Sequence, residues 1–159
     1  MEIHFATTRW SLRYLKGLAV LDDIDSARTI YSRSEVLDFL SGCDVLFVPM
    51  SFESRYHKDL LTIFPTKVTD YWLAQRPIIV YGPEEYAFLA KARNDGYAVT
   101  VAKRGSESLG LAIEEVCDSV ELQESLVEAS RRMVIEHDGL RIARKLMIDL
   151  GIASRQPDA

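Results

Sequence analysis

The chain has 159 residues, which allows one domain of ordinary size with a substantial core. Hydrophobic residues make up 48% of the chain and charged residues 27%, a composition typical of soluble globular proteins and not of disordered ones. The formal net charge of -5 excludes a general affinity for nucleic acid, which requires clustered Lys and Arg to displace counterions. It leaves room for a local basic pocket that takes one small phosphorylated ligand.

Five short apolar runs predict buried strands, at residues 2–6, 27–31, 44–50, 77–82 and 97–101. Nearly continuous runs of this kind are typical of strands covered on both faces of a parallel sheet. Helix-length segments separate most of them, which predicts right-handed βαβ crossovers. We therefore expect an α/β fold with a Rossmann-like doubly wound parallel sheet. A single domain is expected over 1–151, with a frayed tail over 152–159.

Local signals place several helix ends. Ser32 and Glu35 form a capping box, and Asp118 and Glu121 have the same spacing. Pro83 is expected in the first turn of a helix, where its missing N–H has no cost, and residues 94–96 (Asn-Asp-Gly) are expected to end that helix.

The last third of the chain is expected to be almost wholly helical from Ser106 onward. Apolar residues recur there at helical spacing, which predicts one face turned toward the core. These residues are Leu122, Leu126, Ala129 and Met133.

Two cysteines, Cys43 and Cys117, are expected to be reduced and buried as packing residues, since no metal-ligand spacing surrounds either one. No secretion signal is apparent, so a cytoplasmic location is expected. No apolar run approaches the roughly 20 residues that a membrane span requires, so no transmembrane segment is expected. Peripheral membrane association of a full-length protein is compatible with this pattern.

Polar loops follow several of the predicted strands, at residues 7–10, 32–34, 50–66 and 82–85. In open α/β sheets, ligands bind beyond the carboxyl ends of the strands, where such loops gather. The loop 50–66 is long for a compact domain, and long loops are usually functional.

Residues 65–70, PTKVTD, combine features of a nucleotide site. A helix that begins near Thr66 would present backbone N–H groups without intrahelical acceptors, a site for phosphate or diphosphate. Lys67 adds a positive charge, and Asp70, one turn further, is placed to accept hydrogen bonds from ribose hydroxyls. The alternative is that Lys67 and Asp70 form an ordinary surface pair at i,i+3, worth a few tenths of a kcal/mol.

The order of motifs resembles the carboxyl-terminal half of GT-B glycosyltransferases, especially the group called family 4 or group 1. That group has a strand ending in proline, a variable loop, a Pro-Ser/Thr-Lys-x-x-Glu-Tyr helix, and a proline before an apolar strand. The corresponding residues here are Pro49, Pro65-Thr66-Lys67, Asp70-Tyr71 and Pro77, and the strand IIVYG follows. Residues 97–116 also resemble the strand, loop and helix after the donor site, so that the likeness covers roughly residues 28–150.

The resemblance implies a domain that binds a nucleotide-diphosphate sugar as glycosyl donor, in a polysaccharide, glycolipid or glycoprotein pathway. By it, Pro65, Thr66 and Tyr71 would line the donor, with the Thr66 amides facing the diphosphate. Lys67 would neutralise charge on the departing nucleotide, and Asp70 would hold the ribose. Stabilisation of this kind is electrostatic and requires no metal cofactor.

The sequence departs from the family at several positions. Asp70 replaces the usual glutamate, and the second acid of the family's pair would fall at Thr62, which cannot act as an acid. Glu53 is the nearest substitute, and Arg55 and His57 are further loop candidates, although each is also explained as a solvated loop residue. The first strand and helix of the family's donor domain and the amino-terminal acceptor domain have no counterpart, so we expect the isolated chain to be inactive. Arg9 is a weak substitute for the basic pair of the missing unit.

Two other functions stay open: a fragment of a sugar-nucleotide epimerase of the same fold, and a non-catalytic flavodoxin-like or receiver-like regulatory module. A receiver needs an acid cluster at strand ends, whereas Asp44 opens its strand. Residues 22–25 (Asp-Asp-Ile-Asp) contain the Asp-x-Asp spacing of metal-dependent glycosyltransferases of another fold, but a solvated acidic turn explains them better.

Overall fold

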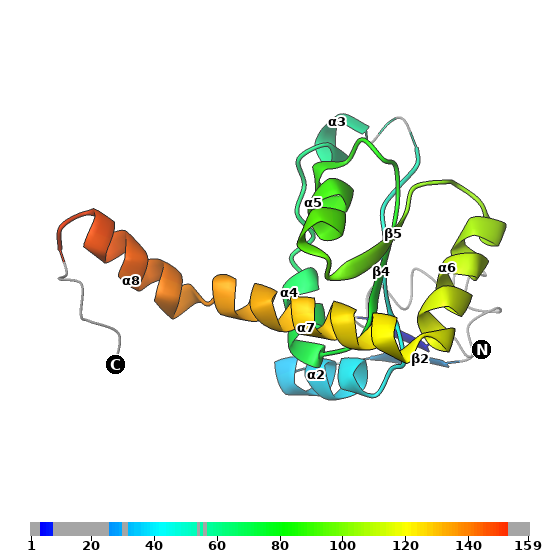
Figure 1. Ribbon diagram of the computed structural model, residues 1–159, viewed down its shortest axis with the longest axis horizontal. Coiled ribbons are helices and arrows are strands. Elements are labelled where there is room, and N and C mark those ends of the chain that lie inside the picture. Colours follow the sequence, from blue (N-terminus) through cyan, green and yellow to red (C-terminus); the bar gives the residue numbers. More distant parts are fainter. Residues whose placement is uncertain (1–3, 8–25, 30–31, 54, 56, 153–159) are drawn as a thin grey trace. The chain divides into compact units, whose positions relative to one another are not determined.

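The computed structural model describes residues 4–7, 26–29, 32–53, 55 and 57–152 (Figure 1). The chain divides into two compact units, Met1–Cys43 and Asp44–Ala159. Arg9, residues 22–25 and most of the 7–10 loop lie outside the described residues.

In the first unit, strands β1 (His4–Thr7) and β2 (Ser26–Thr29) pair in parallel, with His4 opposite Ser26. Helix α2 (Arg33–Ser41) begins with the predicted capping box. The Glu35 amide donates to Ser32 Oγ at 3.2 Å, and the Ser32 amide donates to the Glu35 carboxylate at 3.0 Å. Two orphan donors at the helix start are thereby satisfied.

The second unit holds a three-stranded parallel sheet in the order β3-β4-β5, with Leu46 opposite Ile78 and Ile78 opposite Ala98. Its strands are β3 (Leu46–Pro49), β4 (Ile78–Tyr81) and β5 (Ala98–Val101). Its helices are α3 (His57–Leu60), α4 (Val68–Ala74), α5 (Ala87–Asp95), α6 (Ser106–Asp118), α7 (Val120–Glu136) and α8 (Gly139–Asp149). The predicted α/β class, parallel strands and helical last third are confirmed.

Both faces of this sheet carry helices, because α5 and α6 lie on opposite sides of β4 and β5 (Figure 1). On the α6 side, Ile79 and Val101 pack against Ala112, Val116 and Leu126. A second buried group surrounds Trp72, whose ring makes an edge-on contact with Tyr97 at 5.2 Å and also contacts Phe64 and His137. Burial on both faces explains why the β4 sequence is an unbroken apolar run.

The predicted core face of α7 is confirmed, since Leu126, Ala129 and Met133 are buried and Leu122 is half-buried against the core. The predicted end of α5 is also confirmed, with Gly96 in the left-handed conformation at φ 73°. No helix of the described residues is long and apolar enough to cross a membrane.

Three predicted helix starts are wrong. Ser119, and not Asp118, caps α7, because its backbone is extended between two helices and its Oγ accepts from the Leu122 amide at 3.1 Å. Helix α5 begins at Ala87, so Pro83 lies in the turn before it, where its carbonyl accepts from the Tyr86 amide. Helix α4 begins at Val68 instead of near Thr66.

The prediction for the cysteines is correct in part. Both are free thiols. Cys43 is half-buried and its Sγ donates to the Phe39 carbonyl at 3.4 Å, as its proximity to a core strand suggests. Cys117, however, is exposed, because the buried face of α6 carries Ala112 and Val116 instead.

Candidate functional site

The carboxyl edge of the second unit's sheet carries two of the four loops that the sequence marks as candidates, 50–66 and 82–85, whereas 32–34 belongs to the first unit. Because the strands are parallel, the loops after Pro49, Tyr81 and Val101 start from the same edge. Hydrogen bonds join them: the Met50 amide donates to the Tyr81 carbonyl at 2.7 Å, and the Gly82 amide donates to the Val101 carbonyl at 3.1 Å. These bonds fix the first residue of each loop on the sheet.

A buried turn and a buried phenol hold the first two loops together. A Cβ atom on Gly82 would lie 2.6 Å from the Cβ of Met50, so only glycine allows this approach. The hydroxyl of Tyr86 donates to the Ser51 carbonyl at 2.9 Å, and its ring is almost fully buried. The loops after β3 and β4 are therefore rigidly connected near the edge.

The segment before α4 forms a tight turn that uses part of its own donors. The amides of Val68, Thr69 and Asp70 donate to the carbonyls of Pro65, Thr66 and Lys67 at 3.0, 3.3 and 3.1 Å. This i→i−3 pattern satisfies donors that a regular helix start would leave free. Among the described residues, the amides of Thr66 and Lys67 are the two in this turn that donate to no protein group.

Lys67 lies at the N-cap position of α4 with helical backbone angles. Lys67 is exposed at the surface, but the protein groups around its ammonium displace part of the water and lower its pKa from the ordinary value of 10.5. An anion placed beside this ammonium would offset that cost. Asp70 is half-buried one turn along the helix, at the spacing the sequence predicts.

Two other predicted residues make hydrogen bonds within the protein. The hydroxyl of Tyr71 donates to the Phe47 carbonyl at 3.3 Å, which ties α4 to β3. Pro65 supplies the carbonyl that closes the first turn with Val68. Both residues therefore help to hold α4 and the turn before it in place.

The loop candidates Glu53 and Arg55 pair with each other. The Arg55 Nε lies 2.9 Å from the Glu53 carboxylate, and both side chains are well exposed. The Glu53 amide also donates to Ser51 Oγ at 3.1 Å. An exposed pair of this kind neutralises its own charges, so it contributes little net field at the edge. His57 begins the short helix α3, and its side chain lies outside the described residues.

An aromatic cluster at this edge was not foreseen from the sequence. Phe47 and Tyr81 stack with ring centroids 6.1 Å apart, and Phe52 contacts Tyr81 at 4.9 Å. Phe47 is 39% exposed. The Tyr81 hydroxyl accepts from the Gly105 amide at 2.9 Å, which brings the loop with the exposed Lys103 and Arg104 to the cluster. In the sequence, the signal for this cluster would have been an aromatic residue on each of two adjacent strands, Phe47 on β3 and Tyr81 on β4.

A cavity of about 810 Å³ lies at the opposite, amino edge of the sheet. Its polar groups bond to one another: Arg131 Nε donates to Gln75 Oε1 at 2.6 Å, and Arg131 also pairs with Glu128 at 3.2 Å. The cavity is lined by Asp44, Val45, Gln75, Arg76, Pro77, Cys117, Gln123, Glu124, Val127, Glu128 and Arg131. Acids and bases are mixed there, so the lining favours no one class of ligand.

Comparison with known proteins adds no assignment. The sequence matches no model of a protein family and no curated protein. No group of three His, Cys, Asp or Glu side chains that would hold a metal ion occurs among the described residues. The functional argument therefore depends on the geometry of the carboxyl edge.

Proposed function

We propose that this chain is the donor-binding half of a GT-B glycosyltransferase and binds a nucleotide-diphosphate sugar at the carboxyl edge of the β3-β4-β5 sheet. The parallel strands and the helices on both sheet faces are compatible with a Rossmann-like doubly wound arrangement. The observation that carries the proposal is the turn before α4, where two uncommitted amides and the Lys67 ammonium occur together.

The diphosphate is assigned to this turn for electrostatic reasons. The amides of Thr66 and Lys67 supply two donors, and the partly desolvated ammonium of Lys67 supplies a full charge. Charge-assisted hydrogen bonds to phosphate oxygens are about twice as strong as neutral ones. During glycosyl transfer the same groups would stabilise the charge that develops on the leaving diphosphate.

The ribose is assigned to Asp70. Its carboxylate is half-buried one helical turn beyond Lys67, and a carboxylate can accept two hydrogen bonds from neighbouring hydroxyls. The departure from glutamate shortens the side chain by one methylene, which would bring the ribose closer to α4. The aromatic cluster of Phe47, Phe52 and Tyr81 offers a stacking surface for a base at the same edge.

Isothermal titration of the full chain with nucleoside diphosphates and with the matching nucleosides tests this proposal. Lys67→Ala should weaken diphosphate binding on the order of tenfold to a hundredfold, because it removes a charge-assisted contact worth about 1.5–3 kcal/mol. Binding of the nucleoside should change little. Lys58→Ala is the matched control, since Lys58 is an exposed lysine on neighbouring α3.

Asp70→Asn separates the ribose contact from the phosphate contact. The variant should weaken binding of the ribonucleotide and leave the 2′,3′-dideoxynucleotide unaffected, since only the former offers hydroxyls to the carboxylate. Equal losses for diphosphate and nucleoside in Lys67→Ala, or no binding by the folded chain at millimolar ligand, would contradict the proposal.

A further inference from the structure

Helix α8 separates apolar and basic side chains more sharply than α2, α5, α6 or α7 does. At 3.6 residues per turn, Ile148 falls on the opposite side of the helix, and the other six apolar residues fall within one arc of about 160°. They are Leu140, Ile142, Ala143, Leu146, Met147 and Leu150. The basic residues Arg141, Arg144 and Lys145 occupy the opposite side together with Ile148. Arg144 borders one edge of the apolar arc, and Asp149 lies between Lys145 and the other edge.

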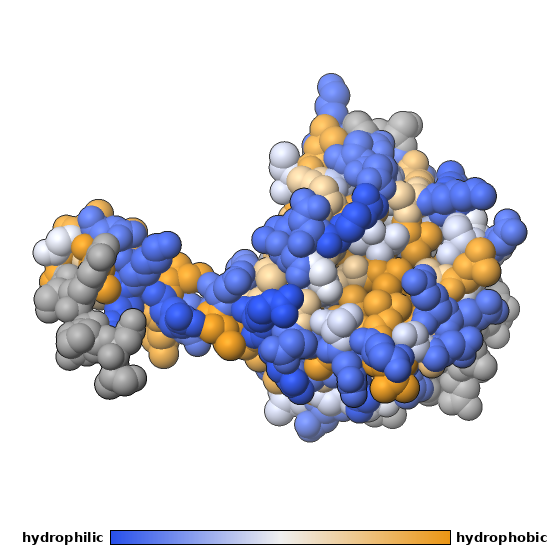
Figure 2. Space-filling view, viewed as in Figure 1, coloured by the Kyte–Doolittle hydropathy of each residue, from blue (hydrophilic) through white to orange (hydrophobic). Residues whose placement is uncertain are grey.

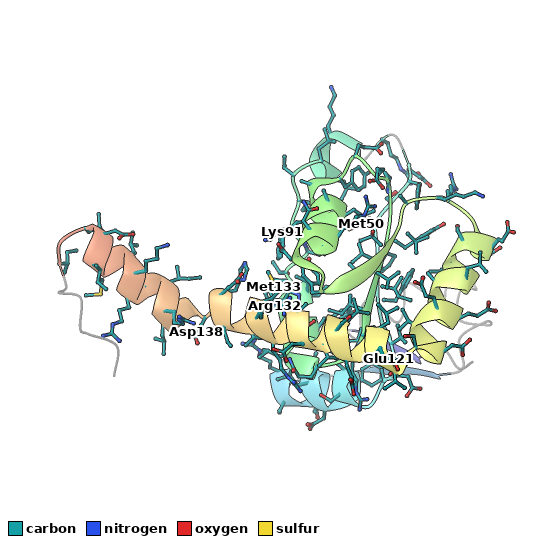
Figure 3. All side chains as sticks on the ribbon, in the orientation of Figure 1. Met50, Lys91, Glu121, Arg132, Met133 and Asp138 are labelled. Carbon is teal, nitrogen blue, oxygen red and sulfur yellow. The ribbon has the colours of Figure 1, made fainter. Side chains whose placement is uncertain are left out.

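The helix has well-defined ends. The Asp138 carboxylate at its start accepts from the Arg141 amide at 2.9 Å (Figure 3). At its end the Ile152 amide donates to the Met147 carbonyl at 2.8 Å and the Gly151 amide to the Ile148 carbonyl at 3.0 Å, with Gly151 at φ 72°. These two bonds form a Schellman motif. The sequence therefore encodes an 11-residue helix with its own start and stop.

No side chain of α8 is buried. Leu140 is 84% exposed and Leu150 63%, and the apolar exposure continues to Ile152 at 68% (Figure 2). Helices shorter than about 12–15 residues are marginal in water without tertiary packing. An apolar surface that covers this face would therefore stabilise the helix.

The charges of α8 indicate which surface that is. Residues 139–152 carry three basic and one acidic side chain, so this segment is net +2, whereas the rest of the chain is net -7. A polar face rich in Lys and Arg opposite a broad aliphatic face is typical of helices that lie in a membrane interface.

We propose that α8 binds the surface of an anionic lipid membrane, with Leu146 and its apolar neighbours inserted among the acyl chains and Arg141, Arg144 and Lys145 at the headgroups. This orientation places six of the seven apolar side chains of α8 in the lipid and its three cations at the headgroups. The proposal is independent of the nucleotide site, because it uses no residue of the carboxyl edge. It gives the chain a reversible attachment that requires no spanning helix.

Cosedimentation of the full chain with vesicles tests this proposal. The vesicles are phosphatidylcholine alone and phosphatidylcholine with 30–40% phosphatidylglycerol, at about 0.1 M salt. The chain should bind the anionic vesicles at least tenfold more tightly than the neutral ones. Raising the salt to about 0.5 M should reduce binding several-fold, since surface charges are then screened.

Two variants of α8 distinguish the contributions of its apolar and basic residues to vesicle binding. Leu146→Gln with Leu150→Gln should abolish binding to both kinds of vesicle. Neutralising the three basic residues to glutamine should weaken binding to anionic vesicles on the order of a hundredfold, from roughly fivefold per basic residue near an anionic surface, and leave neutral vesicles unaffected. All five substituted positions are exposed, so the substitutions should not disturb the fold, and far-UV circular dichroism checks this.

Matched controls lie on α7, where Ile135 is 52% exposed and Arg132 is exposed. Ile135→Gln and Arg132→Gln should leave vesicle binding within about twofold of the parent. Equal binding to neutral and anionic vesicles, or no binding, would overturn the proposal. So would a dimer in sedimentation equilibrium that the double leucine variant dissociates, because the face would then be covered by a second copy.

Discussion

Two buried tyrosines differ in whether their hydroxyls are paired. Tyr86 donates to the Ser51 carbonyl, whereas the Tyr97 hydroxyl is buried with no hydrogen-bond partner within the described residues. Both rings are almost fully buried. A buried hydroxyl without a partner costs about 1–3 kcal/mol, whereas a bonded one contributes about 1 kcal/mol. The two positions therefore respond oppositely to the loss of an oxygen.

Tyr97→Phe should raise the free energy of unfolding by about 1 kcal/mol, and Tyr86→Phe should lower it by about the same amount. Urea denaturation at pH 7 measures both. Destabilisation by Tyr97→Phe as large as that by Tyr86→Phe would contradict the assignment of an unpaired hydroxyl.

The stability gained by Tyr97→Phe should grow at alkaline pH. Burial, with a further contribution from the Asp95 charge, raises the pKa of the Tyr97 phenol. The unfolded phenol ionises near its ordinary pKa of 10.0 while the folded one stays neutral. Stability linked to Tyr97 is therefore fully present below pH 10 and is lost as the pH rises above it. Denaturation at pH 8 and pH 11 should show a steeper loss for the parent than for Tyr97→Phe.

The lowered pKa of Lys67 predicts how nucleotide binding depends on pH. Its ammonium binds a diphosphate only when protonated, and its pKa in the free protein lies below 10.5. Affinity for a nucleoside diphosphate should therefore fall with rising pH before pH 10.5 is reached. Lys67→Arg should remove this decline, because guanidinium stays charged throughout the range. A parent and a Lys67→Arg variant with the same pH profile would argue against a contact between Lys67 and the diphosphate.

At the scale of single elements, the sequence predicted a helix end correctly where one side chain determines that end. The Ser32 capping box and the Gly96 stop are such cases, and both occur in the structure. The start of α7 was missed because Asp118 and Ser119 are both good caps, and only the break between two packed helices selects Ser119. The exposure of Cys117 depends on which face of α6 meets the sheet, which the residue type alone does not indicate.

The candidate site, too, was predictable only where local sequence signals decide. Its position at the carboxyl edge and the spacing of Lys67 and Asp70 were predictable, because they follow from strand order and helix period. The tight turn before α4 that uses three amides, the Glu53–Arg55 pair and the stacking of Phe47 on Tyr81 were not predictable. These features depend on tertiary contacts between loops, which leave no periodic signal in the sequence.

Gly82 and Gly110 give a test at this scale. Gly82→Ala should destabilise the protein by about 1–3 kcal/mol, because the new Cβ would meet the Met50 side chain at 2.6 Å. Gly110→Ala should instead stabilise it by about 0.5–1 kcal/mol, because this position in α6 has open space and glycine is a poor helix former. Thermal unfolding of the two variants checks both signs. A Gly82→Ala protein as stable as the parent would show that the turn after β4 can move away from β3.

For the whole molecule, the division of charge governs how it approaches a membrane. The chain is acidic overall at -5, whereas the α8 segment is positive. An anionic surface would attract α8 and repel the remainder, so membrane affinity depends on the net charge of both parts.

Removal of acidic charge outside α8 should therefore strengthen binding to anionic vesicles. Glu114 and Glu115 on α6 and Glu124 on α7 are exposed, and replacing all three with glutamine brings the formal charge of the chain from -5 to -2 while Arg141, Arg144 and Lys145 are unchanged. Cosedimentation at constant pH and ionic strength measures the change, expected as a several-fold decrease in the dissociation constant. The same substitutions should have a weaker effect in the variant with three glutamines in α8, since that variant keeps the repulsion but loses the attraction. Affinity that the three substitutions leave unchanged would mean that the acidic part of the chain stays too far from the membrane to act on it.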